Sequence, residues 1–296
     1  MIRRPPRSTP SNSSAASDVY KRQALTKNEA FTLEQLEEIL PDDEDEWIVS
    51  SKIDGNRCVI WKKGDEIGAF SDEMKDYNLR RIPHILKTLS KIKGDFILDG
   101  ELVYEVGDQM LGHRGITSFM QKKGDPDPDE LKNVKYVVFD VAYDNEPLFD
   151  KPYEERIKHI KKFAKGPVKQ VRWVKVKTKD IPKAINRVRS TEGAVIRGAS
   201  STYFDRKHLL KFKFTYDLDV VVLDKEKTEN GLWVYLTAVN DGKGRPYVMG
   251  RTFPTDIKAD VGDVIRVNVI FINRRKDPET GEWRYSWELP RVIGKK

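Results

Sequence analysis

The sequence has few residues that build covalent or metal cross-links. Of its 296 residues, one is cysteine and four are histidine. The single cysteine, Cys58, excludes an intrachain disulfide and suits the reducing cytoplasm. The histidines are scattered and lack the spacing of metal ligands. The absence of a run of about 18 apolar residues excludes a transmembrane helix, and the absence of a G-x-x-x-x-G-K-S/T motif excludes a P-loop.

Positive charge is abundant but unevenly spread. The chain carries 54 lysines and arginines against 47 acids, which gives a net charge of +7 and a pI near 9.1. This balance fits a soluble protein with a polyanionic partner. Residues 1–23 hold five basic side chains and one acid, so this segment supplies four of the seven net charges. Charge therefore gives only weak support for nucleic-acid binding by the rest of the chain.

Composition and turn residues divide the chain into three parts. Residues 1–23 are rich in serine and proline, which predicts a disordered leader, and their sequence is typical of a translated cloning adaptor. Residues 24–215 mix strand-like and helical patterns, which predicts an α+β domain. Residues 216–296 contain β-like runs separated by turn residues, which predicts a small barrel. The runs are 218–224, 232–239, 246–253, 263–272 and 283–289.

The most informative segment is Lys52-Ile53-Asp54-Gly55-Asn56-Arg57. Apolar runs on either side predict two strands, so the segment is expected to face a cleft. A lysine amine becomes a nucleophile when desolvation or neighbouring cations free its lone pair. The same pattern also fits an ordinary β-turn with a solvated lysine and a turn glycine. The segment alone does not decide between these two interpretations.

Later segments carry groups suited to a site around this lysine. They are the carboxylates of Glu101 and Glu192, the ring of Phe139, and the amines of Lys211 and Lys213. Each carboxylate lies next to a glycine at a predicted strand, where backbone can approach a ligand closely. The two lysines share one face of a predicted strand whose other face is apolar. Each feature alone fits a solvated surface as well, but together they favour a functional site.

In this order, the segments between about residue 47 and residue 214 resemble the ATP-dependent DNA ligase family of covalent nucleotidyltransferases. The stretch Phe139-Asp140-Val141-Ala142-Tyr143 and the later Pro152-Tyr153-Glu154-Glu155-Arg156 are similar to a region that DNA ligases carry and that capping enzymes and RNA ligases share less. The resemblance implies an α+β fold. A nucleotidyltransferase domain of antiparallel sheets with helices would occupy residues 24–215, and an all-β OB-fold domain would occupy residues 216–296.

The resemblance implies that the chain seals nicks in three steps. Lys52 would attack the α-phosphate of ATP, release pyrophosphate and hold AMP as a phosphoramidate. AMP would pass to the 5′-phosphate of the nick, and the 3′-hydroxyl would then close the strand and expel AMP. Asp54 is expected to orient the loop or Lys52, and Lys211 and Lys213 are expected to neutralise the α-phosphate.

Further residues are implied to bind ATP and a metal ion. Glu101 and Glu192 are expected to hold Mg²⁺, or Mn²⁺ in its place, directly or through water. Glu101 is alternatively expected to accept a hydrogen bond from the ribose. Ser50 is expected to read the adenine amino group, Phe139 to stack on adenine, and Arg57 to contact the ribose or the nick phosphate.

The implied partner is nicked duplex DNA, bound by a monomeric cytoplasmic enzyme. In the predicted barrel, the candidate contacts are Arg274, Arg275 and Arg284. Where many DNA ligases carry Ser-Arg, this chain has Ser71-Asp72, so Lys75 or Arg80 is expected to take over the phosphate contact. Residues 110–129 are predicted to be disorder-prone, and they fit either a part of the grip on DNA or a plain surface loop.

Three other functions remain open. An RNA ligase would share the lysine and both glutamates, but a different C-terminal domain is expected there. A capping guanylyltransferase would share both domains and use GTP. The third is a non-catalytic module whose basic OB-fold domain binds nucleic acid.

Overall fold

The computed structural model describes most of the chain. The described residues are 30–31, 39–71, 73–107, 109–188, 192–240, 246–269, 271–276, 283–288 and 290–296. They form two compact units, Met1–Phe212 and Lys213–Lys296, which are considered separately below. The predicted leader, residues 1–23, and Asp72 lie outside the described residues. No helix among the described residues is long and apolar enough to cross a membrane.

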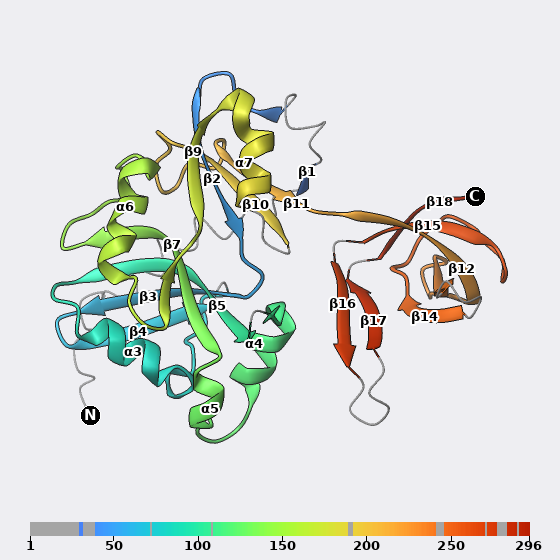
Figure 1. Ribbon diagram of the computed structural model, residues 1–296, viewed down its shortest axis with the longest axis horizontal. Coiled ribbons are helices and arrows are strands. Elements are labelled where there is room, and N and C mark those ends of the chain that lie inside the picture. Colours follow the sequence, from blue (N-terminus) through green and yellow to red (C-terminus); the bar gives the residue numbers. More distant parts are fainter. Residues whose placement is uncertain are drawn as a thin grey trace, which may run out of the picture. The chain divides into compact units, whose positions relative to one another are not determined.

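Unit 1 contains a five-stranded sheet that carries Lys52. Its strand order is β1 (Ala30–Phe31), β11 (Leu209–Lys213), β10 (Gly193–Gly198), β2 (Glu46–Lys52) and β9 (Trp173–Lys177). Strand β2 lies inside the sheet, next to the edge strand β9, and pairs in antiparallel fashion with both neighbours. Its residues Trp47, Ile48 and Val49 are fully buried, because Ile48 joins the main hydrophobic core and helix α7 (Ile181–Arg187) packs on β2 and β9 (Figure 1).

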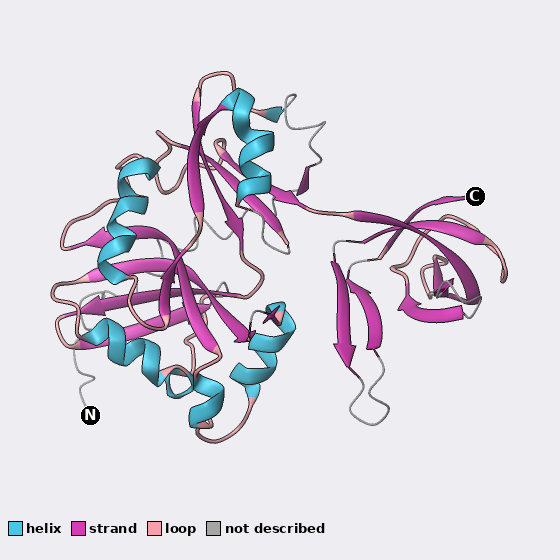
Figure 2. Ribbon diagram, viewed as in Figure 1, coloured by secondary structure: helices cyan, strands magenta, loops and turns pink. Residues whose placement is uncertain are grey.

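A second sheet in unit 1 begins within residues 52–57, which we call the lysine loop. Its strand order is β4 (Glu66–Ser71), β3 (Asn56–Lys63), β5 (Phe96–Val106), β7 (Val134–Asp144) and β8 (Val168–Gln170), and β6 (Gln109–Met110) pairs with β5. Helices border this sheet, as the cyan ribbons of Figure 2 show. They are η1 (Leu79–Arg81), α3 (Pro83–Ser90), α4 (Gly112–Gln121), α5 (Pro128–Leu131) and α6 (Tyr153–Phe163), while η2 (Thr178–Asp180) precedes α7.

Strand β5 shows how this sheet separates its core from its polar face. Leu98 and Leu102 are fully buried in the main hydrophobic core. Because side chains alternate along a strand, Asp99 and Glu101 point to the opposite face. Asp99 is fully buried, whereas Glu101 is half-buried, so this face is enclosed by protein at Asp99 and more open at Glu101.

Residues 110–129 are mainly helical, which corrects the prediction of a disorder-prone stretch. Helix α4 covers Gly112–Gln121 and α5 covers Pro128–Leu131. Ile116 and Phe119 of α4 are buried in the core of unit 1. Tertiary packing of this apolar face therefore stabilises a helix in a segment whose glycines disfavour one.

Unit 2 is all-β. One sheet has the order β14 (Pro246–Arg251), β13 (Trp233–Asn240), β12 (Tyr216–Lys227), β15 (Val264–Val269) and β18 (Arg291–Lys295). Strands β16 (Phe271–Lys276) and β17 (Trp283–Glu288) form a separate hairpin. The core includes Val222, Tyr235 and Ile265.

Two strand predictions for this unit need correction. The predicted run 263–272 is divided between β15 and β16, because β15 pairs with β12 whereas β16 pairs with β17. Strand β18 was not predicted. It is short and has no fully buried side chain, so its sequence pattern is weak, and it forms because it pairs with β15.

Candidate active site

Lys52 lies at the end of β2, opposite the start of β10. Gly193, the first residue of β10, is its partner in the antiparallel pair. The preceding residue, Glu192, places its Oε1 atom 2.6 Å from Nζ of Lys52. The two side chains are 17% and 13% exposed. An ion pair at this depth is less screened than one on the surface, yet both groups remain accessible to a ligand.

Gly55 allows the loop after Lys52 to lie against the second sheet. A Cβ atom at this position would lie 2.3 Å from the carbonyl oxygen of Leu102 and 2.8 Å from Cγ of Glu101. Such distances are far inside van der Waals contact. The glycine therefore permits a close approach of the loop to β5, and this approach brings the lysine loop next to Glu101.

The substitution Gly55→Ala is expected to disturb both stability and chemistry. The added methyl group would push the loop away from β5, at a cost of about 1–3 kcal/mol in the free energy of unfolding. On the sequence-based prediction that Lys52 is the nucleophile, a displacement of about 1 Å would slow AMP attachment by about a hundredfold. Thermal unfolding and the rate of labelling by ATP check the two effects. Gly294→Ala introduces the same methyl group where nothing lies within 4 Å, and it should leave the unfolding midpoint unchanged.

Arg57 is held in place by a buried carboxylate. Its Nε and its second terminal nitrogen donate to Oδ1 and Oδ2 of Asp99 at 3.0 Å and 2.6 Å. The hydroxyl of Tyr203 donates to Oδ2 of Asp99 at 2.7 Å. The Arg57 guanidinium also lies 5.7 Å from the centre of the Phe139 ring. A bidentate pair with further support fixes the direction of the arginine side chain.

Glu101 lies within electrostatic reach of the same groups. Burial raises the pKa of Glu101 from 4.5 to about 8, although the charges of Lys52 and Arg57 lower it; the charges of Glu192 and Asp99 raise it further. On strand β3, Arg57 is the cross-strand partner of Glu101. The structure thus brings together Lys52, Arg57, Glu101 and Glu192, which the sequence separates widely.

Asp140 of β7 links the two sheets of unit 1 through Arg197 of β10. It is fully buried and accepts hydrogen bonds from Arg156 at 2.9 Å and 3.0 Å and from Arg197 at 2.6 Å. Burial would raise the pKa of Asp140, but the Arg156 and Arg197 guanidiniums lower it below its ordinary value. Arg197 also donates to the carbonyl oxygen of Tyr203 at 3.1 Å, which links this ion-pair cluster to Asp99.

Three further candidates, Ser50, Lys211 and Lys213, lie on strands of the sheet that carries Lys52. Ser50 is buried in β2, and its hydroxyl donates to the carbonyl oxygen of Val195 at 3.5 Å. Lys211 and Lys213 are half-buried on β11, whereas Phe212 between them is buried. Strand β11 lies next to β10 and therefore two strands from β2. The roles assigned to these residues and to Asp54 stay predictions.

The candidate DNA contacts lie elsewhere in the chain. Lys75 is exposed after β4 and pairs with Glu73, and Arg80 is exposed in η1. Arg274 and Arg275 belong to β16 and Arg284 belongs to β17, where Arg275 and Arg284 are cross-strand partners. The side chains of these three arginines lie outside the described part of the structure.

Sequence reasoning gave no role to Asp99, Tyr203 or Arg197. Asp99 stands two residues before Glu101 in the same segment, so the alternation of the strand could have placed both on one face. Tyr203 reaches Asp99 from 104 positions further along the chain, and no local pattern indicates this contact. Asp99 and Tyr203 hold Arg57, and Arg197 links the backbone of Tyr203 to Asp140.

The carboxylates fit a magnesium ion that keeps part of its own hydration. Within the described residues, no group of three or more His, Cys, Asp or Glu side chains could by itself hold a metal ion. Mg²⁺ is usually held by one or two carboxylates together with substrate phosphates and water. Glu101 and Glu192 are the two carboxylates predicted for this role, and the charge of Glu192 raises the pKa of Glu101.

Comparisons with known proteins agree with this architecture. The model of the ATP dependent DNA ligase domain matches residues 29–213. The DNA ligase 1 of Korarchaeum cryptofilum is 28% identical over 219 residues, which cover 68% of this chain and 40% of that protein. A Lig E DNA ligase structure has a TM-score of 0.55 at 17% identity and covers 84% of this chain and 94% of its own. The ATP-dependent DNA ligase of bacteriophage T7, in complex with ATP, has a TM-score of 0.50 at 15% identity and covers 90% and 97%.

The fold defines the class: a nucleotidyltransferase domain of antiparallel sheets with helices, followed by an OB-fold domain, which confirms the predicted fold class. The chain belongs to the ATP-dependent DNA ligase family, because the matched domain covers more than half of it. It spans 37–40% of the length of the curated relatives that it matches.

Proposed function

We propose that the chain is an ATP-dependent ligase that seals nicks in duplex DNA and acts as a monomer. The observation that carries this proposal is the contact between Lys52 and Glu192 beside Arg57 and Glu101, in a chain of this family. A lysine on a solvated turn would need none of these neighbours. The buried free thiol of Cys58 supports action in the reducing cytoplasm.

In the first step, Lys52 forms a bond to the α-phosphorus of ATP. An amine attacks through its lone pair, so Nζ must first lose a proton. Oε1 of Glu192, 2.6 Å away, is placed to accept that proton. The bond between the α-phosphorus and the bridging oxygen breaks, and pyrophosphate leaves with the electron pair. Lys211 and Lys213 would balance the negative charge on the phosphate oxygens.

The other residues orient the nucleotide for this attack. Phe139 offers a ring for stacking on adenine, and Arg57 offers donors to the ribose or to the nick phosphate. Glu101 and Glu192 would hold Mg²⁺ together with phosphate oxygens and water, and the bound ion would offset charge that develops on the phosphates. Asp99 keeps the Arg57 side chain directed toward the site.

In the later steps, AMP leaves Lys52 for the 5′-phosphate of the nick, and the 3′-hydroxyl then displaces it. Lys52 Nζ is the leaving group in the second step and regains a proton there. Both transfers exchange one phosphorus bond for another, so positioning and charge balance carry the catalysis. The OB-fold of unit 2 is a class of domain that binds nucleic acid, which supports DNA as the partner.

Covalent labelling tests this function. With Mg²⁺ and ATP labelled at the α-phosphate, the chain should acquire a label that withstands denaturing electrophoresis. ATP labelled at the γ-phosphate should leave it unlabelled, because pyrophosphate departs. Added nicked DNA should remove the label and yield sealed strands. Labelling by GTP alone would favour a capping guanylyltransferase, sealing of RNA alone would favour an RNA ligase, and no label would favour a non-catalytic module.

A further inference from the structure

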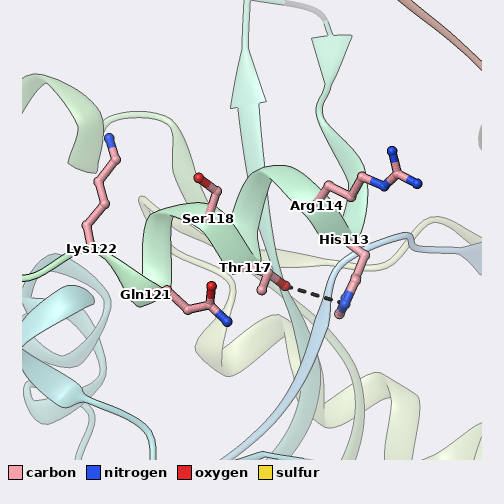
Figure 3. A pocket seen from close by; sticks show the side chains of 6 residues that line it. All are labelled: His113, Arg114, Thr117, Ser118, Gln121 and Lys122. Atoms are coloured by element: carbon pink, nitrogen blue, oxygen red, sulfur yellow. Dashed lines mark hydrogen bonds between the residues drawn. The ribbon is translucent and has the colours of Figure 1, made fainter. Parts of the chain in front are cut away.

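Helix α4 carries a row of hydrogen-bond donors next to the lysine loop. The row, called the α4 stripe, consists of His113, Arg114, Thr117, Ser118, Gln121 and Lys122, and it lines a shallow hollow of about 490 Å³ (Figure 3). We propose that the α4 stripe binds the sugar–phosphate backbone of duplex DNA close to the nick. This assignment rests on the proposed function and adds a contact surface to it.

The chemistry of the α4 stripe suits phosphate. Phosphodiester oxygens only accept hydrogen bonds, and none of the six side chains is a carboxylate. Arg114 and Lys122 add positive charge, while the hydroxyl and amide groups between them add neutral donors. Lys122 pairs with Glu130 but is 52% exposed. An exposed pair of this kind is worth little, so a phosphate can replace the carboxylate.

The spacing of the α4 stripe suits one strand of a duplex. Residues 114 and 118 are four positions apart and therefore lie on one face of α4, and Lys122, four positions further on, follows directly as the C-cap residue. At 1.5 Å of rise per residue, positions 114 and 122 are about 12 Å apart along the axis. This length corresponds to about three or four nucleotides of one DNA strand at 3.4 Å each. Arg114 and Lys122 point away from opposite ends of the row (Figure 3).

The helix below the α4 stripe is anchored. Its inner face places Ile116 and Phe119 in the core. Arg81 is 1% exposed, lies 4.2 Å from the Phe119 ring, and donates to the carbonyl oxygens of Phe119 at 2.8 Å and Gly124 at 3.3 Å. A cation at the last carbonyls of a helix is favourable. A surface fixed in this way loses little freedom when it binds a ligand.

The α4 stripe also contacts the lysine loop directly. His113 donates from Nδ1 to the carbonyl oxygen of Gly55 at 3.1 Å, since a carbonyl can only accept. Thr117 donates from Oγ1 to Oδ1 of Asn56 at 3.0 Å. A DNA strand held along α4 would therefore run beside the loop that carries the nucleophile. This placement fits a contact close to the reacting phosphate and not at a remote surface.

Salt-dependent binding of a fluorescent nicked duplex tests this assignment. The variant Arg114→Ala/Lys122→Ala should bind at least about tenfold more weakly at low salt. Its slope of log K against log salt should be smaller by about 1.8, because each lost phosphate contact removes about 0.9. The control Lys158→Ala/Lys161→Ala removes two exposed lysines from α6 and should retain both the affinity and the slope. Fluorescence anisotropy gives both quantities.

Two further variants keep the test independent of folding defects. Gln121→Lys adds a cation to the α4 stripe and should tighten binding and increase the slope by about 0.9. The exchange Arg114→Lys/Lys122→Arg retains both charges and should preserve the slope.

Unchanged affinity in Arg114→Ala/Lys122→Ala, or an equal loss in the α6 control, would overturn the assignment. The assignment would also be overturned if Arg114→Ala/Lys122→Ala were labelled more weakly at limiting ATP while its affinity for the duplex stayed unchanged. That result would assign the α4 stripe to the phosphates of the nucleotide. Sealing is measured separately. If the unmodified chain binds DNA through the α4 stripe but forms no lysyl-AMP, the proposed function is contradicted and the α4 assignment is not. If the unmodified chain seals nicks and Arg114→Ala/Lys122→Ala binds DNA equally well, the α4 assignment is contradicted and the proposed function is not.

Discussion

Replacing Lys52 with arginine is expected to reduce the rate of covalent AMP attachment by at least about a thousandfold. Arginine keeps the positive charge opposite Glu192, so the ion pair at this site can persist. Its guanidinium keeps its proton at every pH at which proteins are folded, and it therefore offers no lone pair to the α-phosphorus. Labelling with α-labelled ATP over time measures the rate.

This exchange separates a nucleophile from a cation that only binds ATP. A cation that only binds would be replaced well by arginine, whereas a nucleophile would not. The matched exchange Lys161→Arg, on the exposed face of α6, should label at the parental rate. If Lys52→Arg labels as the parent does, another group carries the AMP, and mass spectrometry of the labelled peptide would identify it.

Replacing Asp140 with asparagine is expected to lower the free energy of unfolding by about 3–5 kcal/mol. Asp140 is fully buried and accepts from Arg156 and Arg197, both of which are also buried. Without the carboxylate, two guanidiniums would remain in the interior without a compensating charge. Urea unfolding followed by circular dichroism gives the free energy. The matched exchange Asp129→Asn, whose carboxylate pairs with Lys132 on the surface, should leave the midpoint unchanged.

Asp140 also determines how the free energy of unfolding changes with pH in acid. The pKa of Asp140 in the folded state lies below its ordinary value of 3.8, because attraction by the two arginines exceeds the effect of burial. The unfolded chain therefore binds a proton first as the pH falls. This contribution to stability is fully present above the ordinary pKa and is lost as the pH falls through the folded pKa. Asp140→Asn lacks it, so the two proteins should converge in stability on acidification.

The parts of the site that the sequence predicted are those with local signals. The apolar runs on both sides of Lys52 predicted two strands, and the structure has β2 and β3 there. Alternation along the β11 segment predicted a buried Phe212 between two accessible lysines. A glycine beside each glutamate predicted a place where backbone could approach a ligand closely, which stays a prediction; at Gly100 the structure shows a close approach of the neighbouring strand, since a Cβ there would lie 2.6 Å from the carbonyl oxygen of Val137.

The parts that could not be predicted depend on distant partners. Asp99 acquires its role through Arg57 and Tyr203, which come from separate strands and loops. Helix α4 is stabilised by burial of Ile116 and Phe119 and by Arg81, none of which shows in the local propensity of its sequence. In the same way, the strand β18 was missed because it depends on pairing with β15 and not on its own alternation.

Strand β2 lies inside its sheet, and this position has a consequence for the synthesis of the protein. The strand pairs on one side with β9 and on the other with β10, and its contact between Ser50 and Val195 closes a loop of 145 positions. During synthesis from the N-terminus, β2 leaves the ribosome long before either partner exists. Its backbone edges stay unpaired until β9 and β10 have been synthesised. Long-range pairings of this kind form slowly, and the exposed strand promotes aggregation in the meantime. A nascent chain that ends before β10 should therefore depend on chaperones, and it should gain solubility abruptly once residue 198 has emerged.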